Sequence, residues 1–246
     1  MIGSIHGAST GARSVALAGG VLAAHALPAI TCARPLTRRL VPTLAGVGDA
    51  GRVALTIDDG PHAVATPRFL RLLDSRRVRA TFFLLGEQLA RAPELGRELV
   101  DAGHEIAVHG WTHRCLLLRG PRSTRDDITR AREYIAEVTG VSPHWYRPPY
   151  GVLSGPALLT ARQLGLKPIL WTAWGRDWEL RATPSSVFDT VTRDLAGGGT
   201  ILLHDSDCTS APGSWAATLG ALPRILDECA RRGLVVGPLR SHRSPT

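Results

Sequence analysis

The chain has 246 residues, enough for one large α/β barrel or two small domains, and its 44% hydrophobic and 20% charged residues are ordinary for a soluble globular protein. The net charge is +8, but the 29 basic residues, all arginine except Lys167, are scattered rather than clustered with aromatic residues. Nucleic-acid binding is therefore excluded, and weak association with an anionic membrane or cell-wall polymer is the expected consequence of the charge.

An apolar run from Val15 to Ile30 lies near the start of the chain and is shorter than the ~20 residues that a spanning helix needs. Three interpretations stay open: a signal peptide, a membrane anchor, and a helix packed on the domain. Ala24-His25-Ala26 would serve as a cleavage site, which favours the cell envelope or the exterior. Three arginines within residues 34–39 favour a cytoplasmic or membrane-associated domain instead. Residues 1–50 are taken as this segment and its linker.

Four cysteines stand far apart at Cys32, Cys115, Cys208 and Cys229, with no CxxC spacing. A cysteine metal site is therefore not supported, and mostly buried free thiols are expected. Cys208 with Cys229 is the one pair that stays a candidate disulfide.

Short apolar runs rich in β-branched or aromatic residues predict seven strands from residue 52 onward. They cover Val53–Ile57, Ala80–Leu85, Glu105–Val108, Trp145–Arg147, Pro168–Thr172, Thr200–Leu203 and Leu234–Val236.

Helical patterns with start signals lie between these strands. Thr66-Pro67 precedes a predicted helix over 68–76, and Ser123 with Thr124 precedes one that ends at Gly140. Thr183-Pro184 opens a third helix over 185–195, and a fourth is predicted over 215–232.

This alternation predicts a parallel sheet with right-handed crossovers. No GxGxxG follows the first strand, so a distorted (β/α)7-type barrel is favoured over an open dinucleotide-binding sheet. It would occupy residues 51–240, followed by a tail over 241–246. Reactive residues lie at the ends of predicted strands, which meet at one rim of such a barrel, so an active site is expected there.

Asp58 and Asp59 end the first predicted strand, within Thr56-Ile57-Asp58-Asp59-Gly60-Pro61. Adjacent side chains on an extended chain point in different directions, so one carboxylate can bind a cation while the other serves as a general base. A turn built on Asp-Gly-Pro is the alternative interpretation.

His109-Gly110-Trp111-Thr112-His113 follows the third predicted strand. Two imidazoles four residues apart can bind one ion, and a carboxylate such as Asp59 would complete a set that leaves positions open for water and substrate. His62, His104 and His144 lack such a pattern and are expected to be surface or core residues.

The remaining candidates come from three later strand ends. Arg147 has the fork geometry that holds a carboxylate such as Asp58, and Pro148-Pro149 would present Tyr150. Trp178, next to Asp177, offers an apolar face to a sugar ring or a methyl group, and His204 can donate a proton to a leaving amine. Each also has an ordinary structural interpretation when taken singly.

The motifs TIDDGP, HGWTH, RPPYG, DW and LLH, in this order over residues 52 to about 238, resemble those of the polysaccharide deacetylases. That group is also known as the NodB-homology group or carbohydrate esterase family four. The resemblance implies that a metal-dependent enzyme hydrolyses N-acetyl groups on amino sugars and releases acetate. We expect this enzyme to be a monomer.

The resemblance also implies a role for each matching residue. Asp58 corresponds to the catalytic base, His204 to the general acid, Arg147 to the residue that positions the base, and Asp177 to the partner of the catalytic histidine. Asp59, His109 and His113 correspond to the ligands of one divalent metal ion, usually zinc. Tyr150 corresponds to a backbone donor for the oxyanion, and Trp178 to a wall of the substrate pocket.

Two positions depart from the family pattern. Gly110 stands where family members commonly have serine or threonine, which removes a hydroxyl that could brace the histidine loop. Trp174 stands where many members have an acidic residue. With Trp171, Trp178 and Trp215 it could form an aromatic rim suited to sugar stacking, or these residues could serve packing alone.

Two other functions remain alternatives: a catalytically silent carbohydrate-binding domain, and an amide hydrolase that acts on a small metabolite. The intact Asp58, Asp59, His109, His113 and His204 argue against the silent domain. The sequence does not distinguish a chitin-like from a peptidoglycan-like substrate.

Overall fold

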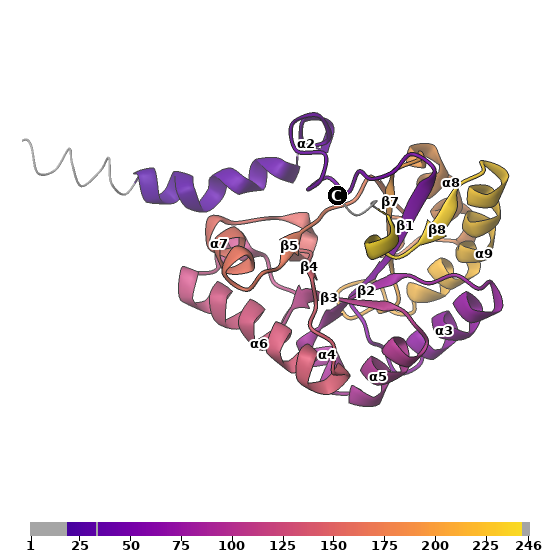
Figure 1. Ribbon diagram of the computed structural model, residues 1–246, viewed down its shortest axis with the longest axis horizontal. Coiled ribbons are helices and arrows are strands. Elements are labelled where there is room, and N and C mark those ends of the chain that lie inside the picture. The colour runs from indigo at the N-terminus through magenta and orange to yellow at the C-terminus, as the bar shows by residue number, and fades with distance from the viewer. Residues whose placement is uncertain (1–18, 33, 243–246) are drawn as a thin grey trace, which may run out of the picture.

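Parallel strands form a strongly curved sheet in the order β5-β4-β3-β2-β1-β7-β6 in the computed structural model, which describes residues 19–32 and 34–242 (Figure 1). The strands are β1 (Arg52–Asp58), β2 (Thr81–Leu85), β3 (Glu105–Gly110), β4 (Trp145–Tyr146), β5 (Lys167–Pro168), β6 (Ala173–Trp174) and β7 (Thr200–His204). A further strand, β8 (Val235–Gly237), pairs with the first half of β1. The predicted fold, a distorted (β/α)7-type barrel, is confirmed.

Seven helices, α3 to α9, surround the strands in the described part of the chain (Figure 1). They are α3 (Thr66–Ser75), α4 (Gly86–Leu89), α5 (Pro93–Asp101), α6 (Pro121–Thr139), α7 (Gly155–Gln163), α8 (Pro184–Asp194) and α9 (Trp215–Arg231). The short 3₁₀ helices are η1 (Leu27–Cys32), η2 (Leu116–Leu118), η3 (Pro149–Gly151) and η4 (Leu239–Ser241).

The central strands are buried on both faces, which explains their continuous apolar runs. Side chains that alternate along each strand enter two different cores. Leu55 and Ile57 of β1 join the large cluster packed against the helices, whereas Ala54 joins a small cluster with Phe83 and Trp145.

Two of the predicted helix starts need correction. Helix α3 begins at Thr66 itself, after Ala65, and the Thr66 hydroxyl donates to Asp205 instead of capping the helix. Helix α6 begins at Pro121, ahead of Ser123, because proline suits the first helical turn. The Thr183 start is confirmed: its hydroxyl accepts from Ser186 N at 3.1 Å, and the Ser186 hydroxyl accepts from Thr183 N at 2.9 Å.

The predicted strand Pro168–Thr172 is wrong. Two short strands stand in its place: β5 pairs with β4 at one edge of the sheet, and β6 pairs with β7 at the other. Residues 169–172 cross between these edges, so the apolar run that resembles a strand is the crossing segment of an incompletely closed barrel. The fully buried Arg147 bridges this seam: its guanidinium donates to Ile169 O at 3.4 Å and to Leu170 O at 3.0 Å.

Both flanking segments pack onto the barrel at the ends of the strands opposite His204. Gly48 N donates to Gly198 O at 2.8 Å, and Asp49 N donates to the carbonyl of the buried His242 at 3.0 Å. Parts of the segment 1–50 and of the tail 241–246 therefore contribute to the base of the barrel.

The apolar N-terminal segment is helical over residues 19–26 and continues through η1 into α2 (Arg34–Leu40). It contacts the barrel at η2, where His25 Nε2 lies 3.2 Å from Leu117 O, and η1 contacts α7. Within residues 19–32 and 34–242, no helix combines the length and apolar character needed to cross a bilayer. The start of the Val15–Ile30 run lies outside the described residues.

Candidate active site

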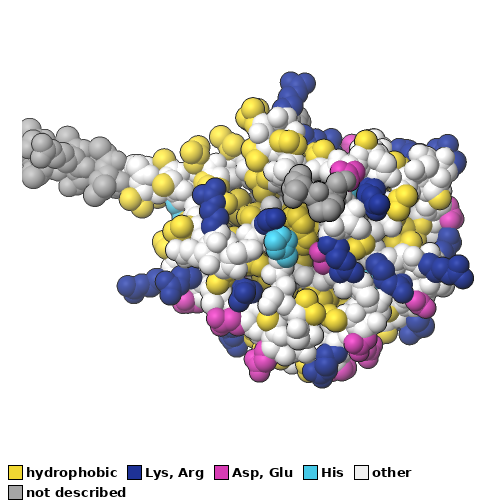
Figure 2. Space-filling view, in the orientation of Figure 1, with side chains coloured by type: hydrophobic (Ala, Val, Ile, Leu, Met, Phe, Trp, Pro, Cys, Tyr) yellow, Lys and Arg dark blue, Asp and Glu magenta, His cyan; other side chains and the backbone are white. Residues whose placement is uncertain are grey.

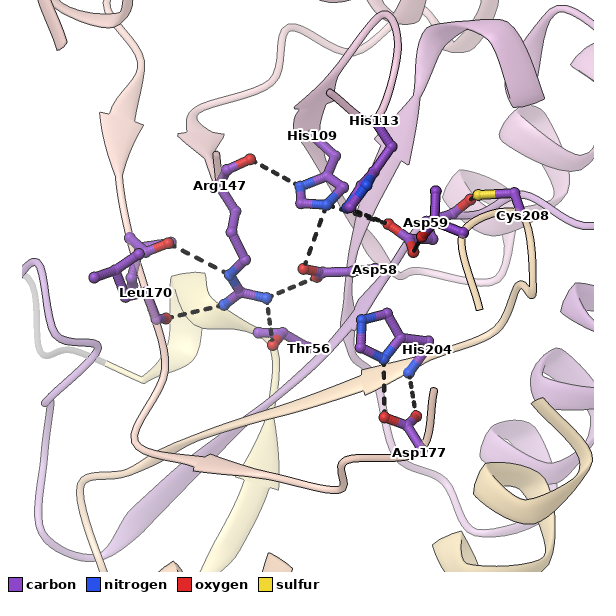
Figure 3. A network of polar contacts seen from close by, with 12 residues as sticks. Thr56, Asp58, Asp59, His109, His113, Arg147, Leu170, Asp177, His204 and Cys208 are labelled. Atoms are coloured by element: carbon purple, nitrogen blue, oxygen red, sulfur yellow. Dashed lines mark hydrogen bonds and ion pairs between the residues drawn. The ribbon is translucent and has the colours of Figure 1, made fainter. Parts of the chain in front are cut away.

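The carboxyl ends of the strands bring the predicted site residues together at one rim (Figure 3). Seven of the nine line a pocket of ≈ 210 Å³: Asp58, Asp59, His109, His113, Tyr150, Trp178 and His204. The other two, Arg147 and Asp177, are buried, and each bonds to one of the pocket residues.

Asp59, His109 and His113 form a compact cluster whose ligand atoms lie within 4.8 Å of one another. Asp59 Oδ1 lies 3.2 Å from His109 Nε2 and 3.4 Å from His113 Nε2. Asp59 has a positive φ of 75° and directly follows Asp58, so the chain turns sharply here and the two carboxylates diverge. The predicted cluster is therefore present, and it could hold a metal ion.

The environment of this cluster fits a cation. Asp59 Oδ1 is buried and has no hydrogen-bond partner among the described residues. His109 Nδ1 lies 2.8 Å from Arg147 O; a proton on Nδ1 would leave the Nε2 lone pair directed at Asp59. Two imidazoles and one carboxylate are a donor set typical of divalent transition metals.

Electrostatics at the cluster favour an ionised Asp59 and a neutral His113. Burial alone would raise the pKa of Asp59, but the adjacent His109 imidazole and the charges of His113 and His204 hold it well below its usual range. Burial lowers the pKa of His113 to about 4. These are the protonation states in which both side chains bind metals.

Asp58 is held by Arg147, a residue outside this cluster. Arg147 Nη1 donates to Asp58 Oδ1 at 2.7 Å and to the Thr56 hydroxyl at 2.8 Å (Figure 3). Thr56 in turn donates to Ile201 O at 2.6 Å, so both acceptors are fixed to the sheet. The other oxygen, Asp58 Oδ2, lies 3.9 Å from His109 Nε2. Asp58 is one of the residues that line the pocket.

His204, in register with Asp58 on the neighbouring strand β7, also lines the pocket and is held by Asp177. His204 Nδ1 lies 2.9 Å from Asp177 Oδ1, and His204 N donates to Asp177 Oδ2 at 2.8 Å. The Thr218 hydroxyl, from α9, donates to the same Oδ2 at 2.7 Å. Burial alone would lower the pKa of His204, but Asp177, with smaller contributions from Asp59 and Asp58, raises it to about 10. The imidazole therefore holds a proton at neutral pH.

Aromatic side chains form one wall of the pocket. Trp178 packs edge-on against His204 with ring centroids 5.6 Å apart, and Trp174 lies 5.1 Å from Trp178. Trp171 also lines the pocket, but Trp215 does not; it packs near His62 at the start of α9. The predicted aromatic rim thus consists of three of its four tryptophans.

Tyr150 also lines the pocket and comes from the short helix η3. Its φ is 60°, a left-handed conformation imposed by the tight turn after Pro148-Pro149. The ring, 58% exposed, packs edge-on against His113 with centroids 4.4 Å apart. Tyr150 therefore contacts the imidazole cluster and the solvent-facing part of the pocket.

Several residues at the site were missed by the sequence interpretation. Thr56 had a signal, because it stands two residues before Asp58 on the same face of a strand. Thr209, whose hydroxyl donates to Asp59 Oδ2 at 3.0 Å, and Thr218 had none, since their partners are distant in sequence.

Asp205 follows His204 and accepts from Thr66 at 2.5 Å. A Cβ on Gly60 would lie 2.4 Å from Asp205 Oδ1, which explains the glycine of the TIDDGP motif.

The remaining cysteines and histidines behave as ordinary residues. Cys115, Cys208 and Cys229 are free, so the candidate disulfide between Cys208 and Cys229 is absent. Of these three described cysteines only Cys229 is buried, so the expectation of mostly buried thiols is wrong. Cys208 is exposed beside the site, with its Sγ 3.8 Å from Asp59 O. His104 is buried and His144 exposed, and neither lines the pocket.

Comparison with known proteins identifies relatives over most of the chain. The family described as "Polysaccharide deacetylase" matches residues 45–169. A chitooligosaccharide deacetylase of Bradyrhizobium sp. (strain ANU 289) is 35% identical over 195 residues, covering 76% of this chain and 88% of the relative. A peptidoglycan-N-acetylglucosamine deacetylase of Bacillus cereus is 31% identical over 183 residues, covering 74% of this chain and 83% of the relative.

The fold has a close counterpart among solved structures. A family 4 carbohydrate esterase from Streptomyces lividans, in complex with acetate, superposes with a TM-score of 0.70 at 33% identity, covering 81% of this chain and 99% of the other. Barrel, rim and relatives together define a hydrolase of amide carbon–nitrogen bonds. The chain belongs to the polysaccharide deacetylase family.

Proposed function

We propose that this protein removes N-acetyl groups from amino-sugar polymers or oligomers, chitin-like or peptidoglycan-like, and releases acetate. The observation that carries the proposal is that a carboxylate and an imidazole, each held by a buried partner, line one pocket. Asp58 is held by Arg147 and His204 by Asp177, and the two residues are in register on the neighbouring strands β1 and β7. Relatives with this fold include deacetylases of both polymer types.

Asp59, His109 and His113 would hold one divalent metal ion, and zinc suits their two nitrogens and one oxygen best. When bound, such an ion polarises the acetamide carbonyl and lowers the pKa of water. The unpartnered, buried Asp59 Oδ1 supports this assignment.

The chain's own residues supply the proton transfers. Asp58 takes a proton from the attacking water as the water oxygen bonds to the carbonyl carbon. His204 gives its proton to the nitrogen as the carbon–nitrogen bond breaks, because an unprotonated amine is a very poor leaving group. The products are acetate and the free amine. The backbone N–H of Tyr150 would stabilise the oxyanion, and Trp178 would pack against the acetyl methyl or the sugar ring.

Acetate release from N-acetylated oligosaccharides is the direct test. We expect the purified full-length protein to release acetate from chitin or peptidoglycan oligomers, to lose this activity with a chelator, and to regain it with Zn²⁺. Elemental analysis should find about one metal equivalent in the wild type and none in the Asp59→Ala/His109→Ala/His113→Ala variant.

Three results would overturn parts of this proposal. A triple variant that keeps its full metal content would place the metal elsewhere. Acetate release confined to small acetamides, with none from any oligosaccharide, would favour the small-metabolite alternative. A metal-loaded protein that releases no acetate from either class would favour a silent carbohydrate-binding domain.

We also propose that the N-terminal segment attaches the enzyme to an anionic membrane surface. Its apolar side chains face solvent: Leu22 is 69%, Leu27 64% and Leu40 71% exposed. Figure 2 shows hydrophobic side chains gathered along this segment, beside arginines near its C-terminal part. No acidic residue precedes Asp49 in the sequence, so nothing in this region would repel anionic lipids. Exposed apolar area combined with positive charge is the pattern of an interfacial segment.

Vesicle sedimentation tests this attachment. We expect the full-length protein to sediment with vesicles containing phosphatidylglycerol, and less at high salt because screening weakens the arginine contribution. Leu22→Glu/Leu40→Glu should abolish sedimentation, whereas Leu180→Glu, at a residue 84% exposed outside this segment, should leave it unchanged. Sedimentation of the double variant at the wild-type level would contradict the proposal. Binding to soluble polyphosphate without vesicle binding would indicate an anionic polymer instead.

A further inference from the structure

The loop between His109 and His113 surrounds the carboxylate of Asp127, a residue outside the five motifs and outside the strands. Asp127, from α6, accepts from Trp111 N at 2.8 Å, from Thr112 N at 3.3 Å and from the Thr112 hydroxyl at 2.8 Å. Arg119 Nη1 lies 2.6 Å from Asp127 Oδ1 and balances its charge. Because the Asp127 side chain is only 4% exposed, these contacts are shielded from water.

Gly110 allows this arrangement. Its φ of +125° is a conformation that side chains disfavour, and a Cβ there would lie 2.9 Å from Asp127 Oδ2. Any side chain at this position, including the serine or threonine of the family pattern, would therefore crowd the carboxylate. Asp127 offers two acceptor oxygens to the loop.

The two imidazoles of the cluster differ in how they are held. His109 has a direct anchor, because its Nδ1 faces Arg147 O. His113 Nδ1 is buried without a hydrogen-bond partner among the described residues. The direction of His113 therefore depends on its backbone and on ring packing against His109 and Tyr150.

We infer that Asp127 is a positioning residue that sets His113 toward Asp59 by fixing the backbone at Trp111 and Thr112. The inference rests on the proposed metal site and adds to it a partner from outside the five motifs. Residues that orient metal ligands typically change metal affinity by 10- to 100-fold when they are replaced.

Asp127→Asn tests this role, because it keeps the shape of the side chain but turns an amide N–H₂ toward the loop donors. Asp126→Asn is the matched control, since Asp126 is the exposed neighbour on the same helix. Zn²⁺ affinity, measured by competition with a chromophoric chelator, should fall by about 10- to 100-fold in Asp127→Asn and stay unchanged in Asp126→Asn. The visible absorption of the Co²⁺-loaded protein should change only in Asp127→Asn.

A folding defect is separated from loss of positioning by thermal unfolding of the metal-free proteins. If Asp127→Asn does not fold, Thr112→Val removes a single bond to the carboxylate and should still weaken Zn²⁺ binding and alter the Co²⁺ spectrum. Wild-type Zn²⁺ affinity and an unchanged Co²⁺ spectrum in a folded Asp127→Asn protein would overturn the inference. Failure of the wild type to bind Zn²⁺ would instead overturn the proposed metal site itself.

Discussion

Asp58→Asn is expected to lower turnover by on the order of 10²-fold or more while the protein keeps its metal. The amide cannot take a proton from water, but its oxygen can still accept from Arg147 Nη1, which lies 2.7 Å from Asp58 Oδ1. Asparagine is preferable to alanine because it leaves an acceptor for the buried guanidinium. Acetate release and metal content should be measured on the same preparation.

Asp59→Asn provides the contrast at the adjacent residue. Asp59 lies 3.2 and 3.4 Å from the two imidazoles, so this variant should lose both metal and activity. If Asp58→Asn lost its metal in parallel with its activity while Asp59→Asn kept it, the roles assigned to the two carboxylates would have to be exchanged.

His204→Ala should impair the hydrolysis of acetamides far more than that of acetate esters with good leaving groups. An amine must be protonated as it departs, whereas an activated phenolate leaves without a proton. His144→Ala, at an exposed histidine outside the pocket, should change neither rate. Equal losses on acetamides and activated esters would rule out a general-acid role for His204.

The pH dependence gives a second measure of this pair. Asp177 raises the pKa of His204 to about 10, so the protonated form is present at neutral pH and is lost only at alkaline pH. Asp177→Asn should lower that pKa, and the alkaline limit of acetamide hydrolysis should move toward neutral pH. The Asp177→Asn/His204→Ala double variant should be little worse than His204→Ala, because the two side chains act as one unit. An unchanged alkaline limit in Asp177→Asn would contradict the proposed coupling.

Much of the fold was predictable because buried parallel strands leave long apolar runs. The residue ranges predicted for β1, β2, β3 and β7 differ from the structure by at most two residues at each end. The segment 169–172 was not predictable, since an apolar run at a seam has the same composition as a strand. What distinguishes them is whether a neighbouring strand lies on each side, which a local pattern does not contain.

The site was predictable to the extent that its residues lie in motifs at strand ends. The nine residues that the sequence indicated come together, and their partners Thr56, Thr209, Thr218 and Asp127 were missed. Asp127 illustrates the reason. Its sequence context indicates the first turns of a helix, and only packing of α6 against β3 brings its carboxylate to the histidine loop.

The seam of the barrel changes how inactive relatives of this protein should be recognised. Arg147 holds the segment that crosses the seam through Ile169 O and Leu170 O, besides contacting Asp58. A descendant that abandoned catalysis would still need this arginine for its architecture. The His204 side chain does not hold the barrel together in this way, since its hydrogen bond in the described structure is to Asp177. Retention of the arginine is thus weak evidence of activity in a homologous sequence, and retention of the histidine is strong evidence.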